Sequence, residues 1–276
     1  MIIYRFLPFL YISSYVVILF FVKQLQLDSS LKALSRFMVS FIVLSPLFII
    51  NRDKLKTKNH KIYFIRAVIA CCAVLLTYRV YSVLPFTSAT SISLSEPLFS
   101  ALLSFLILRE QISSRKWIML LIGYIGVLVS MWPIDFANKY LVMQGLLILA
   151  NIVVSFNSVI MKKLSTNEDT VTVLFYSYIY IIPLLWMVNA FMGNNLCCSE
   201  VFTYQNMKIL IPIGVLGGLN NILMIFSLKK LPVSTFTSAQ YFRIFLATAF
   251  SIFIGECISI KEIVGSIIIV VSSAFM

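Results

Sequence analysis

Two charged residues, Glu96 and Arg243, lie near the middle of two long apolar segments of the chain. The segments share a Leu-Pro start, at Leu84-Pro85 and at Leu231-Pro232, and the second start follows the first by 147 positions. At that offset Glu96 aligns with Arg243. A charged side chain at the centre of a bilayer costs about 3 kcal/mol in insertion measurements, so it needs a partner, a polar cavity or a function. The aligned charges therefore predict a central polar site between two internal repeats.

The first apolar segment has the chemistry of a site for a cation or an ammonium group. Ser93, Glu96 and Ser100 are spaced three and four residues apart, so they share one face of a helix. Pro97 has no amide hydrogen, so the carbonyl of Ser93, one turn earlier, loses its usual donor and the helix kinks. A free carbonyl beside Glu96 would make a polar spot for a positive group.

The second apolar segment offers the complementary chemistry. Gln240 and Arg243 share a helical face, and a guanidinium presents a planar fork of donors that suits a carboxylate. Arg243 and Glu96 together would bind the two ends of a zwitterion. The alternative is that Glu96 and Arg243 pair with each other and hold the two halves of the chain together.

Further candidates for the site are polar or aromatic residues within other parts of the apolar segments: Asn151, Asn220 and Tyr241. The asparagines could line a cavity, and the tyrosine could stack on a planar ligand. The alternative for the asparagines is a hydrogen bond between helices. The alternative for the tyrosine is packing or a place at the membrane interface.

The elements that must position these residues are membrane-spanning helices. Hydrophobic residues make up 61% of the 276 residues and charged residues 12%, whereas a soluble domain carries roughly 25% charged residues. The apolar residues form blocks of about 20, the length that crosses a bilayer as a helix. The fold class is therefore an all-α polytopic membrane protein with ten predicted spans, at 3–22, 31–50, 62–83, 86–108, 115–133, 140–161, 171–192, 207–228, 232–254 and 260–276.

The ten spans divide into two halves of five, residues 1–133 and 139–276. Five is an odd number, so the second half must cross the membrane in the opposite sense to the first. The sequence therefore predicts two inverted five-helix repeats, an arrangement that places a binding site near the bilayer midplane between them.

The net charge of +12 is distributed by topology, which argues against a nucleic-acid partner. With both termini inside, fourteen of the 22 lysines and arginines lie in or beside inner loops, among them the basic loop 51–61. Excess positive charge on the inner side orients a membrane protein. We therefore expect both termini in the cytoplasm, and we expect the lipid bilayer, including anionic headgroups, to be the partner of the basic loop.

The chain resembles the EamA type of the drug/metabolite transporter superfamily. The resemblance rests on Glu96-Pro97 in the fourth span, an apolar run that ends at Arg109-Glu110, and the early Arg36-Phe37. In the second half, Tyr241-Phe242-Arg243 is more similar to a Tyr-Arg-Tyr variant found in S-adenosylmethionine uptake carriers of intracellular bacteria. The resemblance implies a secondary transporter of a small, zwitterionic or amino-acid-like metabolite in a bacterial inner membrane. It leaves S-adenosylmethionine uptake as an alternative function. In either case we expect H⁺, Na⁺ or a counter-substrate as the coupling partner.

Enzyme chemistry has little support in the sequence. The single histidine, His60, lies in a basic loop, and the cysteines at 71, 72, 197, 198 and 257 lack the spacing of zinc ligands. A phosphate-binding GxxxxGK[ST] loop is absent. We expect no cofactor and no metal. The alternative from a different class is a membrane-embedded enzyme or a lipid-handling protein.

Overall fold

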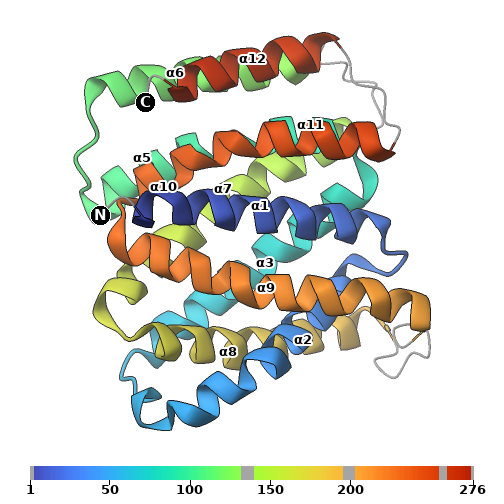
Figure 1. Ribbon diagram of the computed structural model, residues 1–276, viewed down its shortest axis with the longest axis vertical. Coiled ribbons are helices and arrows are strands. Elements are labelled where there is room, and N and C mark those ends of the chain that lie inside the picture. Colours follow the sequence, from blue (N-terminus) through green and yellow to red (C-terminus); the bar gives the residue numbers. More distant parts are fainter. Residues whose placement is uncertain (1–2, 132–139, 195–202, 255–259, 275–276) are drawn as a thin grey trace.

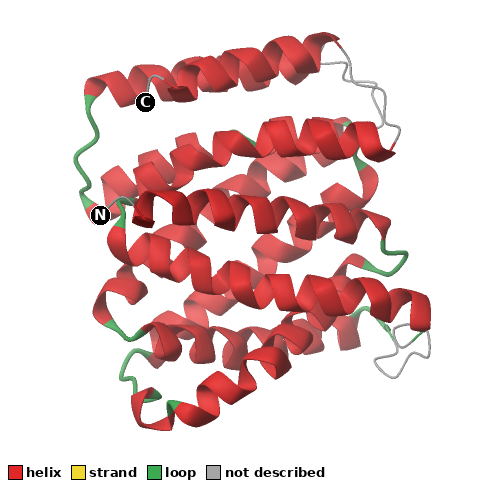
Figure 2. Ribbon diagram, viewed as in Figure 1, coloured by secondary structure: helices red, strands yellow, loops and turns green. Residues whose placement is uncertain are grey.

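The computed structural model describes residues 3–131, 140–194, 203–254 and 260–274, and within these ranges every regular element is a helix (Figures 1 and 2). The first half holds α1 (Ile3–Gln24), α2 (Ser29–Ile50), the short 3₁₀ helix η1 (Arg52–Lys54), α3 (His60–Val83), α4 (Phe86–Ser93), α5 (Glu96–Leu108) and α6 (Ser114–Met131). The second half holds α7 (Leu141–Asn167), α8 (Thr170–Phe191), α9 (Tyr204–Lys230), α10 (Val233–Ser238), the 3₁₀ helix η2 (Ala239–Phe242), α11 (Arg243–Ile254) and α12 (Ile260–Ala274).

Seven stretches of the described chain are long and apolar enough to cross a membrane. They are α1, α2, α3, the stretch formed by α4 and α5 together, α7, α8 and α9. Large apolar side chains such as Ile42, Phe105 and Trp186 are exposed on their outer faces, as expected where the solvent is lipid. The protein is thus an all-helical, multi-pass membrane protein. The predicted division between residues 133 and 139 falls outside the described residues.

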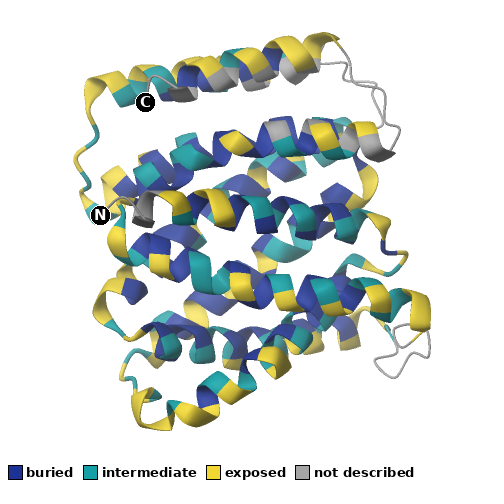
Figure 3. Ribbon diagram, viewed as in Figure 1, coloured by how far each residue is buried: buried dark blue, intermediate teal, exposed yellow. Residues whose placement is uncertain are grey.

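The long helices lie side by side as a bundle, with α6 and α12 packed on each other along one edge (Figure 1). Buried residues occur along the central helices, and exposed residues are frequent on α2 and α6 at the two edges (Figure 3). The N- and C-terminal ends both lie toward the left side in Figure 1, the side that also carries the connection between α2 and α3. The two termini and the basic 51–59 connection therefore share one end of the bundle.

The two segments that carry Glu96 and Arg243 are broken helices. The kinked helix predicted around Pro97 is in fact two helices: α4 ends at Ser93 and α5 begins at Glu96, with Pro97 in its first turn. The break comes before the proline because a proline is tolerated at the start of a helix but not in its interior. In the second half, η2 separates α10 from α11, and α11 begins at Arg243. The two charges thus occupy equivalent positions, each at the start of the second half-helix.

The broken segments cross each other in opposite directions. The first half-helix of one segment contacts the second half-helix of the other, because α4 packs on α11 and α10 packs on α5. Such crossed contacts arise only if the two segments run antiparallel. The pair of breaks at which Glu96 and Arg243 stand is therefore brought together at the crossing.

Helices α2 and α9 approach closely because glycines face the contact. A Cβ atom at Gly217 would lie 2.8 Å from Arg36 Nε and 2.9 Å from Ser40 Oγ, and one at Gly214 would overlap the side chain of Val39. The hydroxyl of Ser40 donates a hydrogen bond to the carbonyl of Gly214 at 2.6 Å. These small residues let α9 pack against the α2 face that carries Arg36.

Candidate functional site

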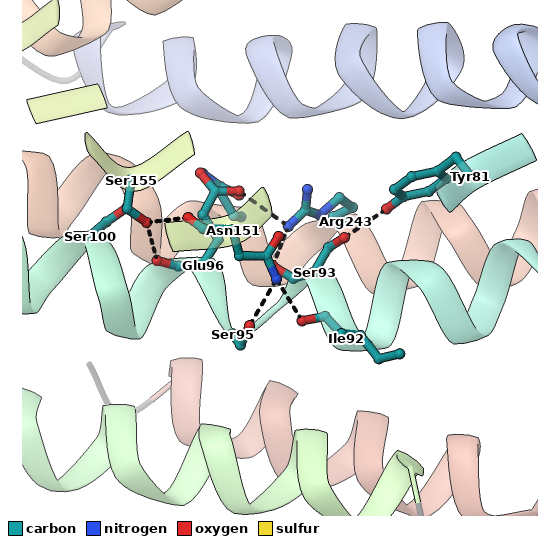
Figure 4. A network of polar contacts seen from close by, with 10 residues as sticks. Tyr81, Ile92, Ser93, Ser95, Glu96, Ser100, Asn151, Ser155 and Arg243 are labelled. Atoms are coloured by element: carbon teal, nitrogen blue, oxygen red, sulfur yellow. Dashed lines mark hydrogen bonds and ion pairs between the residues drawn. The ribbon is translucent and has the colours of Figure 1, made fainter. Parts of the chain in front are cut away.

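Glu96 and Arg243 form a buried ion pair at the crossing of the broken helices (Figure 4). Arg243 Nη2 lies 3.7 Å from Glu96 Oε2, and the side chains are 3% and 6% exposed, respectively. Gln240 Nε2 donates a hydrogen bond to the other carboxylate oxygen, Oε1, at 2.8 Å. Glu96 stands in the first turn of α5, where the helix dipole favours negative charge. The carboxylate is therefore held by an arginine, an amide and a helix N-terminus.

The carbonyl that Pro97 leaves without a donor is used by the arginine. Arg243 Nη2 donates to the Ser93 carbonyl at 2.9 Å, and the Ser93 hydroxyl shares a 3.0 Å hydrogen bond with the Tyr81 hydroxyl. The predicted polar spot for a cation is thus occupied by an internal cation in this conformation. Arg243 Nε, by contrast, is buried without a hydrogen-bond partner, so the guanidinium keeps unused donor capacity.

Helix α7 supports the break between α4 and α5 from one side. Asn151 Nδ2 donates to the Ile92 carbonyl at 3.0 Å and to Ser95 Oγ at 2.8 Å. Ser155 Oγ lies 3.2 Å from the Glu96 carbonyl and 3.0 Å from Ser100 Oγ. Figure 4 shows these contacts converging on the residues between the two half-helices. Broken helices expose carbonyls that need donors inside a membrane protein, and these side chains supply them.

A cavity of about 100 Å³ lies beside the ion pair. Its wall is formed by α1, α2, α3, α7, α8 and α9, and it is polar at many points. The polar lining residues are Tyr11, Tyr15, Arg36, Arg66, Thr77, Tyr78, Asn157, Ser177, Asn220 and Asn221. Glu96 and Arg243 are not in its wall. Tyr15 links the two sites, because it lines the cavity and its ring lies 5.8 Å from the Arg243 guanidinium.

The structure brings some predicted site residues together and places others apart. Ser93, Glu96, Gln240 and Arg243 form one cluster, as their contacts show. Tyr241 is buried and lies against Gly123 of α6, where a Cβ atom would be 3.1 Å from the tyrosine hydroxyl.

The two predicted asparagines have different places. Asn151 supports the helix break and does not line the cavity. Asn220 lines the cavity, and its Nδ2 donates to the Tyr11 carbonyl at 2.8 Å and to Ser14 Oγ at 2.9 Å. Its amide thus has a part in both interpretations, cavity lining and a bond between helices.

Arg66, Tyr11 and Tyr15 line the cavity but are not among the site residues predicted from the sequence. Arg66 is one of the fourteen basic residues expected in or beside inner loops, but it is only 6% exposed and lines the cavity. A sequence signal was present: Arg66, Ala70, Ala73 and Thr77 share a helical face in which small residues leave space beside a charge. Tyr11 and Tyr15 carried no comparable signal, since aromatic residues are common throughout the apolar segments.

Within the described ranges, no group of three or more His, Cys, Asp or Glu side chains is placed to hold a metal ion. The charged chemistry described above rests instead on arginines, one carboxylate and neutral hydrogen-bonding groups. Such a set offers charge and hydrogen-bond donors and acceptors to a polar solute.

One protein-family sequence model matches nearly the whole chain. The sequence model of the EamA-like transporter family matches residues 2–132 and 142–276. An S-adenosylmethionine uptake transporter of Rickettsia prowazekii is 27% identical over 91% of this chain and 83% of its own length. A riboflavin transporter of Vibrio cholerae is 26% identical over 58% of this chain and 54% of its own length.

A solved crystal structure superposes on this fold with a TM-score of 0.71, covering 96% of this chain and 95% of the other. Its sequence is 13% identical, so the likeness concerns the fold alone. The helix arrangement described above therefore occurs in a protein of very different sequence.

Proposed function

The chain belongs to the EamA-like transporter family, and we propose that it is a secondary transporter that moves a small metabolite across a bacterial inner membrane. Sequence relatives along most of its length are named as transporters. The fold supplies what a carrier needs: apolar helices, a polar cavity among them, and a buried ion pair at broken helices. The energy would come from a gradient of H⁺, Na⁺ or a counter-substrate.

The proposed architecture is ten spans in two inverted repeats, residues 1–133 and 139–276. Three observations support it. The family model matches two successive segments. The half-helices α4 and α5 start at positions equivalent to the starts of α10 and α11, at the 147-residue offset. Equivalent helices also make equivalent contacts with the other half. Helix α1 packs on α9 as α7 packs on α3, and α2 packs on α9 as α8 packs on α3.

The proposed transport site is the Glu96–Arg243 pair together with Ser93 and Gln240. The observation that carries this proposal is the burial of both charges at the crossing of two broken helices, next to a polar cavity. In broken-helix carriers the cargo binds where helices are interrupted near the midplane. Opening of the pair would free a carboxylate for an ammonium group and a guanidinium for a carboxylate. This chemistry suits a zwitterionic, amino-acid-like cargo.

Uptake of S-adenosylmethionine is the second candidate, favoured by the names of the relatives. That compound carries both an ammonium and a carboxylate group, so the same pair would serve it. Riboflavin, named for other relatives, has no such charges. The orientation with both termini in the cytoplasm is proposed from the positive charge of the 51–61 loop.

Proteoliposomes test the function directly. Purified protein is reconstituted and challenged with radiolabelled amino acids, S-adenosylmethionine and riboflavin, with and without imposed H⁺ and Na⁺ gradients. We expect saturable, gradient-dependent uptake of a zwitterion into protein-containing vesicles and none into empty vesicles. Uptake of riboflavin alone would contradict the zwitterion proposal. Hydrolysis of a supplied solute or lipid without net movement would contradict the transporter proposal.

A further inference from the structure

The cavity beside the ion pair carries two buried arginines and no acidic residue. Arg36 from α2 and Arg66 from α3 both line it, and each is 6% exposed. None of the cavity residues is Asp or Glu. Among the described residues, neither arginine forms an ion pair with a carboxylate. A buried charge without a counter-charge is costly, so a cavity with this composition is completed when an anion enters it.

The protein satisfies only part of the donor capacity of these arginines. Arg36 Nη1 donates to the Tyr78 hydroxyl at 2.8 Å, and Arg66 Nη1 donates to the Ser177 hydroxyl at 2.5 Å. Arg66 Nε is buried with no hydrogen-bond partner. A guanidinium has five N–H donors in a fixed plane, arranged to meet two oxygens of one anion. Arg66 thus lines the cavity without a carboxylate partner and with part of its donor capacity unused.

The other lining residues indicate the chemistry of the part of the ligand that carries no charge. Tyr11, Tyr15, Phe37 and Tyr78 provide aromatic surface. Asn157 also lines the cavity, and its Oδ1 is buried without a hydrogen-bond partner. An amide oxygen accepts a hydrogen bond, so it would complement an N–H or O–H donor on the ligand. The ligand class is a small organic anion or zwitterion with an apolar or planar body.

We infer that Arg36 and Arg66 form an oxyanion-binding site that receives the carboxylate or phosphate group of the cargo, while Asn157 Oδ1 accepts a hydrogen bond from a donor elsewhere on the cargo. The inference rests on the proposed transport function, but it concerns residues other than the Glu96–Arg243 pair. In the described conformation Arg243 is engaged by Glu96 and by the Ser93 carbonyl, whereas Arg66 is not engaged by any carboxylate. The cavity site is therefore the one ready to accept an anion. A purely cationic solute has no counter-charge in this cavity.

Binding by purified protein in detergent tests this inference without requiring transport. Four probes are compared by the shift in melting temperature: phenylalanine, 3-phenylpropanoate, which lacks the ammonium group, phenethylamine, which lacks the carboxylate, and inorganic phosphate. We expect phenylalanine and phenylpropanoate to stabilise the wild-type protein and phenethylamine to have no effect. Stabilisation by phosphate but not by the carboxylates would assign the site to phosphorylated cargo. Stabilisation by phenethylamine alone, or by no probe, would overturn the inference.

Variants locate the site. Arg66→Gln should weaken binding of the effective probe about tenfold or more, the value of charge-assisted hydrogen bonds, and Arg36→Gln should act similarly. Arg66→Lys keeps the charge without the planar fork and should bind with intermediate affinity. Arg79→Gln is the matched control, because Arg79 is an exposed arginine of the same helix. Wild-type binding by both Arg66→Gln and Arg36→Gln would overturn the site.

The binding and transport assays distinguish an error in the oxyanion site from an error in the proposed function. Arginine-dependent binding without uptake in proteoliposomes would leave the oxyanion site standing and contradict the transport function. Uptake of a cargo that both Arg66→Gln and Arg36→Gln transport as the wild-type protein does would leave the function standing and overturn the oxyanion site.

Discussion

Each charged group of the Glu96–Arg243 pair has a second polar partner. Arg243 also bonds the Ser93 carbonyl, and Glu96 also accepts from Gln240. The Arg243 Nε is still unpartnered, so the pair is held without being fully satisfied. We propose that this pair opens during transport, and substitutions at the two residues distinguish that role from a purely structural pairing.

Substitutions at the pair separate a transport role from a structural one. Arg243→Lys replaces a planar fork by a point charge and should reduce uptake about tenfold or more. Glu96→Gln should do likewise while the protein still inserts and folds. Uptake in proteoliposomes and melting temperature in detergent are measured together, with Arg79→Lys as an exposed control.

A purely structural pair predicts a different pattern. Each single change would then leave a buried charge unpaired and cost about 3–5 kcal/mol of stability. The charge-swapped double variant, Glu96→Arg with Arg243→Glu, would recover stability and transport. Wild-type uptake by both stable single variants would contradict the transport assignment.

At the scale of elements, the candidate site lies at the breaks in two helices. Side chains of neighbouring helices stabilise the first of these breaks by hydrogen bonding to the backbone there. This break lies between α4 and α5 inside the bundle. The Ile92 carbonyl there accepts from the Ser95 amide at 3.0 Å and from Asn151 of α7, and the Ser93 carbonyl accepts from Arg243 of α11. The residues that hold the break thus come from both halves of the chain, which couples its shape to their relative position.

Removal of the Asn151 amide should destabilise the break. Asn151→Ala removes the side-chain donor to the Ile92 carbonyl, which keeps the Ser95 amide, and should lower the stability by about 0.5–1.5 kcal/mol. Asn167→Ala, at the exposed end of the same helix, should change stability little. Melting of the purified proteins in one detergent provides the comparison. Equal melting temperatures for the two variants would contradict the supporting role of Asn151.

The glycine contact between α2 and α9 makes a second prediction at this scale. Gly214→Ala places a methyl group against Val39, and overpacking of this kind costs about 1–3 kcal/mol. At Gly145 of α7 a methyl group would meet nothing within 4 Å, so Gly145→Ala should be neutral or should gain up to about 1 kcal/mol from helix propensity. A lower melting temperature for Gly145→Ala than for Gly214→Ala would contradict the packing account.

At the scale of the whole molecule, the ends of the bundle differ in charge. The connection after α2 carries Arg52, Lys54, Lys56 and Lys58, Lys61 follows in the first turn of α3, and both termini lie at the same end (Figure 1). Positive residues are retained on the cytoplasmic side. The opposite end, where α9 begins at Tyr204, is therefore expected to face outward.

Cysteine labelling in intact cells tests the orientation. In a cysteine-free background, Lys58→Cys is compared with Gln205→Cys, both exposed positions at opposite ends of the bundle. A membrane-impermeant maleimide added from outside should label position 205 and should reach position 58 only after the membrane is opened. Ready labelling of position 58 in intact cells would reverse the topology and place both termini outside.

The sequence by itself determined the class of the molecule and the alignment of its two charges at equivalent positions. Blocks of apolar residues longer than a bilayer is thick permit only helices, because lipid offers no partner for free backbone groups. The 147-residue offset that aligns Glu96 with Arg243 can be read directly from the positions in the chain. Pro97 has no amide hydrogen, so the sequence also predicts that the Ser93 carbonyl lacks its usual backbone donor. These features depend only on the types of residues and their spacing along the chain, and both are given by the sequence.

Only the tertiary structure decided what each polar side chain meets. It placed Arg243 on Glu96 and Ser93, put Asn151 at the helix break and Asn220 at the cavity, and moved Arg66 from an assumed loop-side charge into the cavity wall. An apolar helix has no strong sequence signal for its inward face, since lipid and protein interior are both apolar. The facing of each helix is set by close packing, as where Gly214 and Gly217 admit α2, and that packing brings the arginines of α2 and α3 to one cavity.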